Sequence, residues 1–502
     1  MVGTALAHPT SWRRDRPWQF ASIAIILVAV LIQAFSRTDV DLAWLLTVGE
    51  KMMAGQRLYV DVIEFNPPLS VLLYLPAIWL GRWLGAPPEL AVIPLVLAGS
   101  IASVALSARI VAPLIGDDAA RRWKFVSAGL FILLLFPAGV FNQREHIAVI
   151  ALLPFVCVAA TRATGRGPPI LLLALAGAGA GVAMSIKPHF ALAAGLPLLV
   201  NVWTRKSLRP ALGIESWIAA AVVVAYGMVV VLAFPHFLTD VLPGDRDAYL
   251  AVRKPLLILL TAPAVSAFVI LLCVGRLLFG DRGPDIGPTL PFLAASVGGG
   301  GSYLIQGKLW PYQAYPMLAF ALFFVLAGPQ LIGGGESEAR WPNLRKWLIG
   351  LFALAAVAMA MGWFTVKGAI PDGLRERVAR IAPSPRMLAI SPDNALGHPL
   401  IREVHGVWVG SVSCQMFSAE AVRREAAGPV TPTVRARLES IMADDRRRLA
   451  DDILAGRPNV ILIDERGYDW GRWARSDPRL AAALGSFRPD RSFDGVDVWI
   501  RR

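Results

Sequence analysis

The sequence predicts a polytopic α-helical membrane protein that carries a small α/β domain at its carboxyl-terminal end. Of the 502 residues, 56% are hydrophobic and only 17% are charged, a composition too apolar for an ordinary soluble protein. Runs of roughly 17 to 25 apolar residues recur between residues 20 and 364, and each is long enough to cross a bilayer as a helix. From residue 367 to residue 502 the chain is charged and free of any such run. We therefore expect a transmembrane domain at 1–366 and a soluble domain at 367–502.

The apolar runs predict about eleven spanning helices. A further apolar stretch at residues 70–85 is interrupted by Trp79, Arg82 and Trp83 near its end, which is typical of a helix that lies along the membrane interface. The candidate spans cover residues 20–35, 90–115, 125–141, 147–160, 170–186, 190–203, 217–234, 256–274, 289–305, 314–331 and 348–364. Residues 20–35 lack a good cleavage site after them, so we interpret them as an uncleaved first helix.

The distribution of basic residues predicts the orientation of these helices. If residues 70–85 spanned the membrane, most basic loops would face outward; if they lie at the interface, those loops face the cytoplasm, as the positive-inside rule favours. We therefore expect a multi-pass inner (plasma) membrane protein with a cytoplasmic amino terminus, an extracytoplasmic loop at 36–88 and an extracytoplasmic (periplasmic) carboxyl-terminal domain. The residues that then face the cytoplasm are Arg13, Arg14, Arg16, Arg121, Arg122, Lys124, Arg162, Arg166, Arg205, Lys206, Arg209, Arg282, Arg340, Arg345 and Lys346.

The loop at 36–88 concentrates carboxylates between apolar segments that otherwise avoid charge. Its acids are Asp39, Asp41, Glu50, Asp61 and Glu64. Carboxylates are costly to hold at a membrane surface unless they are solvated or used. In the expected topology they share one side of the membrane with polar segments at 143–146, 187–189, 235–255 and 306–313. This arrangement predicts a functional site at the outer face.

Acids, bases and aromatic residues together suit the transfer of a sugar from a lipid-linked phosphate. A carboxylate can act as general base for a hydroxyl acceptor, and cations stabilise a phosphate leaving group. Aromatic faces and amide groups can bind the sugar. The candidates are Asp39, Asp41 and Glu64 for the acids, Arg144, Lys187, Arg253, Lys254 and Lys308 for the cations, and Tyr59, Gln143, Trp310 and Tyr312 for sugar contacts.

The first loop resembles that of the GT-C class of integral-membrane glycosyltransferases, in particular the relatives of the aminoarabinose and protein O-mannosyl transferases. The resemblance rests on the order of the acidic pair, the run Gly-x-x-Leu-Tyr-x-Asp that begins at Gly55, and Glu64-x-Asn-Pro-Pro. It implies that Asp41 is the general base, with Asp39 as the alternative register. It maps the acid before the Pro-Pro pair to Glu64 and a family Arg or Lys to Arg144.

The segments that begin at Lys187 and Gln306 also look like parts of this group. The candidate catalytic residues are therefore Asp41, Asp39 and Glu64. The candidate substrate-binding residues are Arg144, Lys187, Lys308, Tyr312, Gln143, His189 and Asp61. For His189 the alternative is a structural role in which the ring is hydrogen-bonded. Asp61 is equally suited to a structural role, in which it caps the interfacial helix or holds the loop.

The resemblance implies an inverting hexosyl- or pentosyltransferase of cell-envelope polysaccharide biosynthesis. It would move a sugar from a polyprenyl-phosphate donor to an envelope lipid, glycan or protein. Two other classes remain open: a polysaccharide or lipid transporter (flippase), and a non-catalytic envelope-assembly protein. A transporter is disfavoured because charges cluster near helix ends and no internal repeat is visible. The sequence identifies neither the sugar nor the acceptor.

Metal, cofactor and nucleic-acid roles receive little support from the sequence. Of the three cysteines only Cys414 lies in the soluble domain, and no zinc-type spacing exists. We expect no cofactor to be required; a divalent cation is compatible with the acids, and metal ligands are not assigned. The net charge of +13 is better explained by orientation and lipid headgroups than by nucleic acid, because the tail has no basic helix or aromatic-basic ribbon. The expected partners are the lipid-linked donor, membrane lipid and an unidentified acceptor.

The remaining patterns predict structure. The tail contains strand-like pieces at 386–391, 406–412, 459–465 and 495–500 and a charged helix at 434–455, which indicates a small α/β domain. Asp464 and Glu465 end one strand without a partner motif. The glycine runs at 176–184 and 298–302 lack a phosphate-loop context and favour close helix packing, with a local break near 298–301 as the lesser alternative.

Overall fold

The computed structural model describes residues 15–243, 252–280, 283–332, 342–366 and 370–502. The predicted cytoplasmic residues Arg13, Arg14, Arg282 and Arg340 lie outside these ranges, as do parts of the 235–255 loop and the predicted domain boundary at 367. Contacts divide the chain into two compact units. One, the helical unit, comprises Met1–Ser36, Val92–Met228 and Lys254–Val366; the other, the loop-tail unit, comprises Arg37–Ala91, Val229–Arg253 and Lys367–Arg502.

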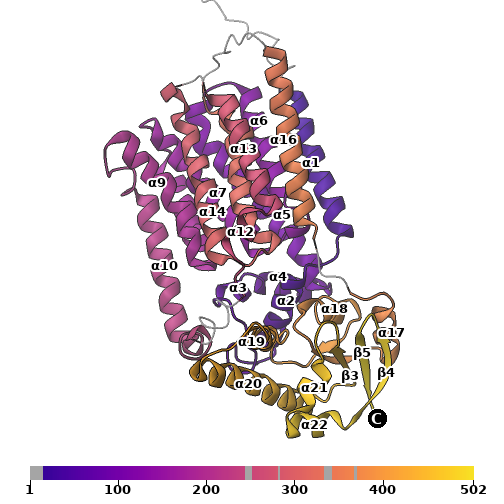
Figure 1. Ribbon diagram of the computed structural model, residues 1–502. Helices are drawn as coiled ribbons and strands as arrows, with labels where there is room; N and C mark the ends of the chain where they lie inside the picture. Colours follow the sequence, from indigo (N-terminus) through magenta and orange to yellow (C-terminus); the bar gives the residue numbers. More distant parts are fainter. Residues whose placement is uncertain (1–14, 244–251, 281–282, 333–341, 367–369) are drawn as a thin grey trace, which may run out of the picture. The chain divides into compact units, whose positions relative to one another are not determined.

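The membrane helices follow the predicted apolar runs (Figure 1). Every one of the eleven predicted runs coincides with a helix or with consecutive short helices. Their bounds are α1 Arg16–Phe35, α5 Pro88–Ile115, α6 Ala119–Leu130 with η2 Phe131–Leu135 and η3 Ala138–Val140, α7 Arg144–Ala163, α8 Ile170–Ile186, η4 Pro188–Phe190 with α9 Ala191–Arg205, α10 Ile214–Ala233, α12 Leu256–Leu260 with α13 Pro263–Phe279, η6 Gly283–Thr289 with α14 Leu290–Gln306, η7 Pro311–Ala314 with α15 Tyr315–Leu322, η8 Phe323–Ala327 and η9 Gly328–Gln330, and α16 Pro342–Phe364.

Six helices of the described chain are long and apolar enough to cross a membrane by length and composition. The others are shorter or change helix type along their length, as at the π-helical turn η2. Residues 70–85 form two short helices, α3 Leu69–Leu72 and α4 Leu75–Leu84. Neither is long enough to span a bilayer. The chain is a multi-pass membrane protein, as its composition predicts.

Glycines allow the helices of the helical unit to approach closely. A Cβ atom at Gly298 would collide with the backbone of Leu192 in α9, and one at Gly299 with the backbone of Met317 in α15. Gly177 and Gly179 in α8 similarly face the backbones of Glu215 and Ala151. The prediction of close packing is confirmed for both glycine runs, and α14 continues through 298–301 without a break.

The first loop contains α2, Val40–Met53, besides α3 and α4. Asp39 is its N-cap, and its Oδ1 accepts from the N–H of Asp41 at 2.8 Å. Eight consecutive residues of α2, Leu42 to Gly49, are buried. A helix that is buried nearly all round is held by its neighbours rather than by amphipathicity. In the same unit, the π-helical segment η5 Phe237–Val241 packs Phe237 against Tyr59, with ring centroids 5.1 Å apart.

The carboxyl-terminal part is an α/β fold around a five-stranded sheet of order β2-β1-β3-β5-β4. β1 pairs in parallel with β2 and β3, and β5 pairs in antiparallel with β3 and β4. Its elements are α17 Leu374–Ile381, β1 Arg386–Ile390, η10 Asn394–Leu396, α18 Leu400–Glu403, β2 Val407–Trp408, α19 Met416–Ala426, α20 Pro432–Gly456, β3 Val460–Asp464, α21 Trp470–Arg475, α22 Pro478–Leu484, β4 Phe487–Phe493 and β5 Val496–Arg501.

The core of this fold lies between the sheet and the helices α19 to α22. Ile461 and Ile463 of β3 pack with Leu449 and Ile453 of α20 and with Trp470 of α21. All five residues of β3 are buried, as expected for a central strand. The predicted strands and the long helix are confirmed, although β2 is shorter than predicted.

Candidate functional site

The acids of the first loop occupy different environments. Asp39 and Asp41 are both partly exposed, but Asp39 caps α2 whereas Asp41 stands in its first turn. A carboxylate whose oxygen accepts helix N–H groups is engaged in holding the helix. The two acids therefore differ in position: Asp39 is the N-cap of α2, and Asp41 lies within its first turn.

Glu64 is buried and tied to its surroundings. Its Oε2 accepts from Trp44 Nε1 at 2.5 Å, and its Oε1 accepts from the N–H of Asn66 at 2.9 Å and from Asn66 Nδ2 at 2.5 Å. Tyr59, which has a positive φ of 70°, donates its hydroxyl to the carbonyl of Asn66 at 2.6 Å. Glu64 thus fastens the Asn-Pro-Pro turn to α2, and this geometry suits a positioning role.

Asp61 closes a turn of the loop. Its carboxylate accepts from the N–H of Arg57 at 2.7 Å and pairs with the Arg57 guanidinium at 3.0 Å. The hydrogen bond from that guanidinium holds the pKa of Asp61 below its usual value. Of the two roles that the sequence leaves open for Asp61, these contacts favour holding the loop.

The cations of the helical unit gather around Lys187, which lies between α8 and η4. Lys187 Nζ forms a buried ion pair with Glu145 Oε1 at 2.5 Å and donates to Gln306 Oε1 at 3.0 Å. It also lies over the ring of Tyr312, 5.5 Å from the centroid. Residues of α7, of α14 and of the short helix η7 that follows α14 therefore converge on one ammonium group.

Lys308 is connected to the same group through aromatic rings. Its Nζ lies 4.5 Å from the ring centroid of Trp310, whose ring is 5.8 Å from that of Tyr312. Arg144, at the first position of α7, is buried beside Glu145. We call Arg144, Lys187 and Lys308 the basic cluster. Three cations near helix ends are suited to an anionic group, because hydrogen bonds from charged donors to an anion are strong.

Three further polar residues, Gln143, His189 and His146, belong to the same helical unit as the basic cluster. Gln143 is the N-cap of α7 and is buried. His189 packs its ring against Phe190, and its Nε2 has no hydrogen-bond partner among the described residues. His146 is buried and its Nε2 lies 2.7 Å from the carbonyl oxygen of Leu133, which fits a structural role. Since a carbonyl can only accept, this nitrogen carries the proton.

Three participants were missed by sequence reasoning. Glu145 and Gln306 both bind Lys187. They lie in polar segments that the sequence analysis names, but the sequence assigns neither residue a function. Their signal was a single acid next to Arg144 and a polar residue at the end of a spanning run. Trp44, which binds Glu64, carried no signal, because an apolar residue in a buried helix looks like core.

The structure brings the predicted residues together within two groups. Asp39, Asp41, Asp61 and Glu64 belong to the loop-tail unit, whereas the basic cluster, Gln143, His189 and Tyr312 belong to the helical unit. A single site that combines both groups stays a prediction. Across the described residues no group of three or more His, Cys, Asp or Glu side chains could hold a metal ion.

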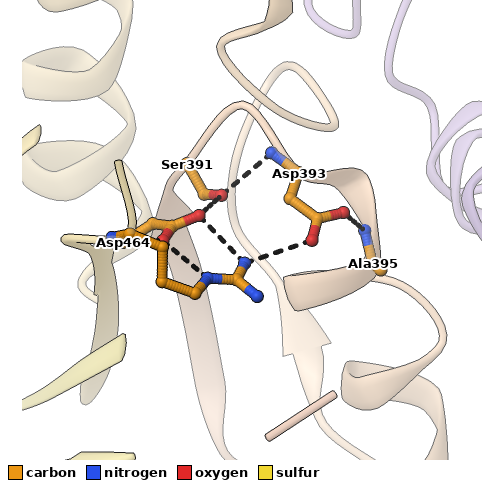
Figure 2. A network of polar contacts seen from close by, with 5 residues as sticks. Ser391, Asp393, Ala395 and Asp464 are labelled. Carbon is orange, nitrogen blue, oxygen red and sulfur yellow. Dashed lines mark hydrogen bonds and ion pairs between the residues drawn. The ribbon is translucent and has the colours of Figure 1, made fainter. Parts of the chain in front are cut away.

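A separate polar network lies where β1 and β3 end (Figure 2). Ser391 Oγ lies 2.8 Å from Asp464 Oδ2, and Arg466 binds both Asp464 and Asp393. Burial opposes the charged form of Asp464, but the hydrogen bonds from Arg466 and Ser391 keep its pKa below the usual value. Because each of these charges has a partner, we assign the network a structural role.

The comparisons with known proteins identify the fold. The chain is similar to the crystal structure of ArnT from Cupriavidus metallidurans bound to undecaprenyl phosphate, with 14% identity, 98% of each chain covered and a TM-score of 0.55. The apo form of that protein gives 14% identity, 96% and 98% coverage, and a TM-score of 0.53. The chain has the GT-C fold. The mycobacterial arabinofuranosyltransferase AftD gives a TM-score of 0.46 with 16% identity, and the match covers 99% of this chain and 40% of AftD.

No family model matches the chain. A search of curated proteins also finds no match. The predicted fold class is therefore confirmed by structure alone, at a level of identity that sequence comparison does not detect.

Proposed function

We propose that this protein is a membrane glycosyltransferase that takes a sugar from a polyprenyl-phosphate donor. The observation that carries the proposal is the buried basic cluster around the Lys187–Glu145 pair in a chain with the GT-C fold. A cluster of cations at the end of membrane helices suits a phosphate whose lipid tail keeps it at the membrane surface. The fold neighbour ArnT has been captured with undecaprenyl phosphate, which is the same ligand chemistry.

In the proposed reaction the basic cluster binds the donor phosphate and stabilises it as a leaving group. The Glu145 carboxylate and the Gln306 amide orient the Lys187 ammonium group. As the bond between the sugar C1 and the phosphate oxygen breaks, its electron pair stays on the phosphate, where charge-assisted hydrogen bonds are strongest. No proton needs to be supplied to this leaving group.

Asp41 is the proposed general base. It accepts the proton of the acceptor hydroxyl as the acceptor oxygen bonds to C1 from the opposite side, so the configuration inverts. Asp39 already caps α2 and Glu64 already accepts three hydrogen bonds, so both are assigned to positioning. The proposed site is extracytoplasmic, and the acceptor is an envelope molecule.

The test compares the three acids in one transfer assay. Asp41→Asn removes the basicity of the side chain while keeping its shape, so transfer is expected to fall by roughly 10²- to 10⁴-fold with donor binding retained. Glu64→Gln should have an intermediate effect, and Asp39→Asn a smaller one, because asparagine is also a good N-cap. Transfer by the purified protein is measured from a polyprenyl-phosphate-sugar pool extracted from the native membrane.

Each alternative outcome has a distinct meaning. An inactive Asp39→Asn beside an active Asp41→Asn would move the base to Asp39. Normal transfer by all three amide variants would reject the acidic loop as the catalytic site.

A further inference from the structure

The loop-tail unit contains a cavity of about 670 Å³ that the proposed reaction does not use. One wall is a face of α2, on which Thr47, Glu50 and Lys51 lie. The opposite wall comes from the carboxyl-terminal fold. Its polar members are Arg386, Arg402 and Asp452, with Trp408 among the apolar ones. The volume falls within the 300–1,000 Å³ that is typical of small-molecule pockets.

The polar side chains of these walls are held in place. Lys51 Nζ donates to the carbonyl of Gly410 at 2.8 Å. Asp452 Oδ2 accepts from the N–H of Ser411 at 2.8 Å and from its Oγ at 2.9 Å. Arg402 binds Glu50 through both carboxylate oxygens, at 2.6 and 3.0 Å. A ligand would therefore meet donors and acceptors that are already oriented.

The charges that line the cavity are balanced. Its lining includes the three cations Lys51, Arg386 and Arg402 and the three acids Glu50, Asp61 and Asp452. A strongly anionic or cationic ligand would meet like charges, and an apolar ligand would remove Lys51 and Asp452 from water. A polyhydroxylated ligand differs from both, because each hydroxyl group can donate to a carboxylate and accept from an ammonium or guanidinium group.

Lys51 and Asp452 are also available as charged partners near neutral pH. Burial lowers the pKa of Lys51 to about 8 and raises the pKa of Asp452 to about 6. Between these two values both groups are predominantly charged. They can then form the charge-assisted hydrogen bonds that are about twice as strong as neutral ones.

We propose that this cavity binds a saccharide portion of the acceptor. The inference rests on the proposed transferase function, since α2 carries both the cavity wall and the proposed base. Thr47 follows Asp41 by six residues, about 9 Å along the helix axis, on a different face. An acceptor with more than one sugar unit would be bound in the cavity by one unit while another reaches the base. The acceptor is thus a glycan or glycolipid.

The proposal is tested on the full-length protein in nanodiscs, with a printed array of neutral, amino and acidic oligosaccharides of two to six units as the probe. Wild type should bind a subset of the neutral or amino sugars. Lys51→Met and Asp452→Asn should each weaken binding by about tenfold or more, because each removes a charge-assisted hydrogen bond. Val407→Trp, at an exposed residue of the lining, should block the cavity without disturbing buried packing.

Matched controls separate the cavity from surface charge and from catalysis. Arg472→Gln changes a side chain that is 87% exposed and outside the lining, and should bind as wild type does. Asp41→Asn should also retain saccharide binding while losing transfer, so a failure of the proposed base leaves this proposal intact. The proposal is overturned if the folded wild type retains no saccharide, if only acidic ones bind, or if the three cavity variants bind normally.

Discussion

At the scale of single residues, the contacts distinguish acids that the sequence leaves equivalent. The sequence places five carboxylates in one loop, and spacing alone cannot say which hold structure. Asp39 and Asp61 form local contacts of the kind expected for caps and turns, which short-range patterns can suggest. The burial of Glu64 under Trp44 depends on how the turn folds back over α2, and no local rule predicts it. The sequence therefore names the candidate acids, and the contacts add which of them hold the structure of the loop.

The basic cluster gives a prediction for Arg144. Arg144→Gln keeps hydrogen-bond donors but removes the charge, so binding of polyprenyl phosphate should weaken by roughly ten- to a hundredfold. Binding to the protein in nanodiscs is measured by native mass spectrometry across a lipid titration. Arg122→Gln, at an exposed residue of α6, is the control and should bind normally. Unchanged affinity in a folded Arg144→Gln protein would remove Arg144 from the phosphate site.

A second prediction at this scale concerns Asp445 of α20. Burial raises its pKa to about 6, against the opposing effects of the Ser418 hydrogen bond and the Arg448 charge and with Asp444 adding repulsion. The folded state thus binds more protons than the unfolded state between about pH 4 and pH 6, and stability falls as pH rises through that range. Asp445→Asn should remove the part of this dependence that Asp445 contributes, while Asp452 of the same helix, whose pKa burial also raises to about 6, keeps its own part.

Above pH 6 the asparagine variant should be more stable than wild type by roughly 1–2 kcal/mol. This is less than the full pKa shift implies, because Asp445 is partly exposed to solvent. Hydrogen exchange of the α19 and α20 amides in the full-length protein, corrected for intrinsic rates, reports the difference. Equal pH dependence in the two proteins would show that Asp445 does not titrate in this range.

At the scale of elements, apolar runs and alternation identified the membrane helices and the central strands. The strand β4 was not predicted from the sequence, because its sequence is polar and its residues are mostly exposed at the sheet edge. Its signal was the Asp494–Gly495 pair, whose φ angles of 46° and 79° form the tight hairpin to β5. The short helices α3 and α4 were distinguishable from a span only through their interrupted composition and the loop charges.

Arg402 of α18 is expected to hold the helix α2 in place. It binds Glu50 of α2 and Glu89 of α5, and its side chain is only 12% exposed. Arg402→Met would leave both carboxylates without this partner, and should weaken the protection of α2 amides by about 1–3 kcal/mol, below the full value for a buried pair because Glu50 is partly exposed. Hydrogen exchange in the full-length protein is the measurement.

Arg37→Met is the matched control for Arg402. Arg37 pairs with Glu403, the residue that follows Arg402 in the sequence. Because the Arg37 side chain is 58% exposed, its loss should change the protection of the α2 amides by about 0–1 kcal/mol. Equal effects of the two substitutions would contradict a specific role for Arg402 in holding α2.

At the scale of the whole molecule, the distribution of basic residues predicts the orientation of the chain, and cysteine labelling tests it. Single cysteines are introduced at Gln56 in the first loop, Arg472 in α21 and Arg122 in α6, in a background where the exposed Cys273 is replaced by serine. The positive-inside rule predicts that the first two react with an impermeant reagent from outside and the third does not. Labelling at Arg122 from outside would reverse the predicted topology and with it the shared outer site.

The grouping of distant segments was beyond what the sequence could predict at this scale. Composition changes sharply near residue 367, so the sequence associates the loop at 36–88 with the helices that flank it. Contacts instead cluster that loop with the carboxyl-terminal fold. The responsible bonds, such as Lys51 to Gly410 and Arg402 to Glu50, join residues that no periodicity or motif relates.

These bonds have a consequence for how the protein is made. Glu50 precedes Arg402 by 352 residues, so at a translation rate of 5–20 residues per second the ribosome adds Arg402 about 20–70 seconds after Glu50. During that interval the nascent loop must remain without the partners that later secure α2. A chain truncated before residue 386 would contain the membrane helices, but its first loop would lack the partners that the carboxyl-terminal fold supplies. Assembly of the loop-tail unit therefore requires that the carboxyl-terminal fold has been synthesised.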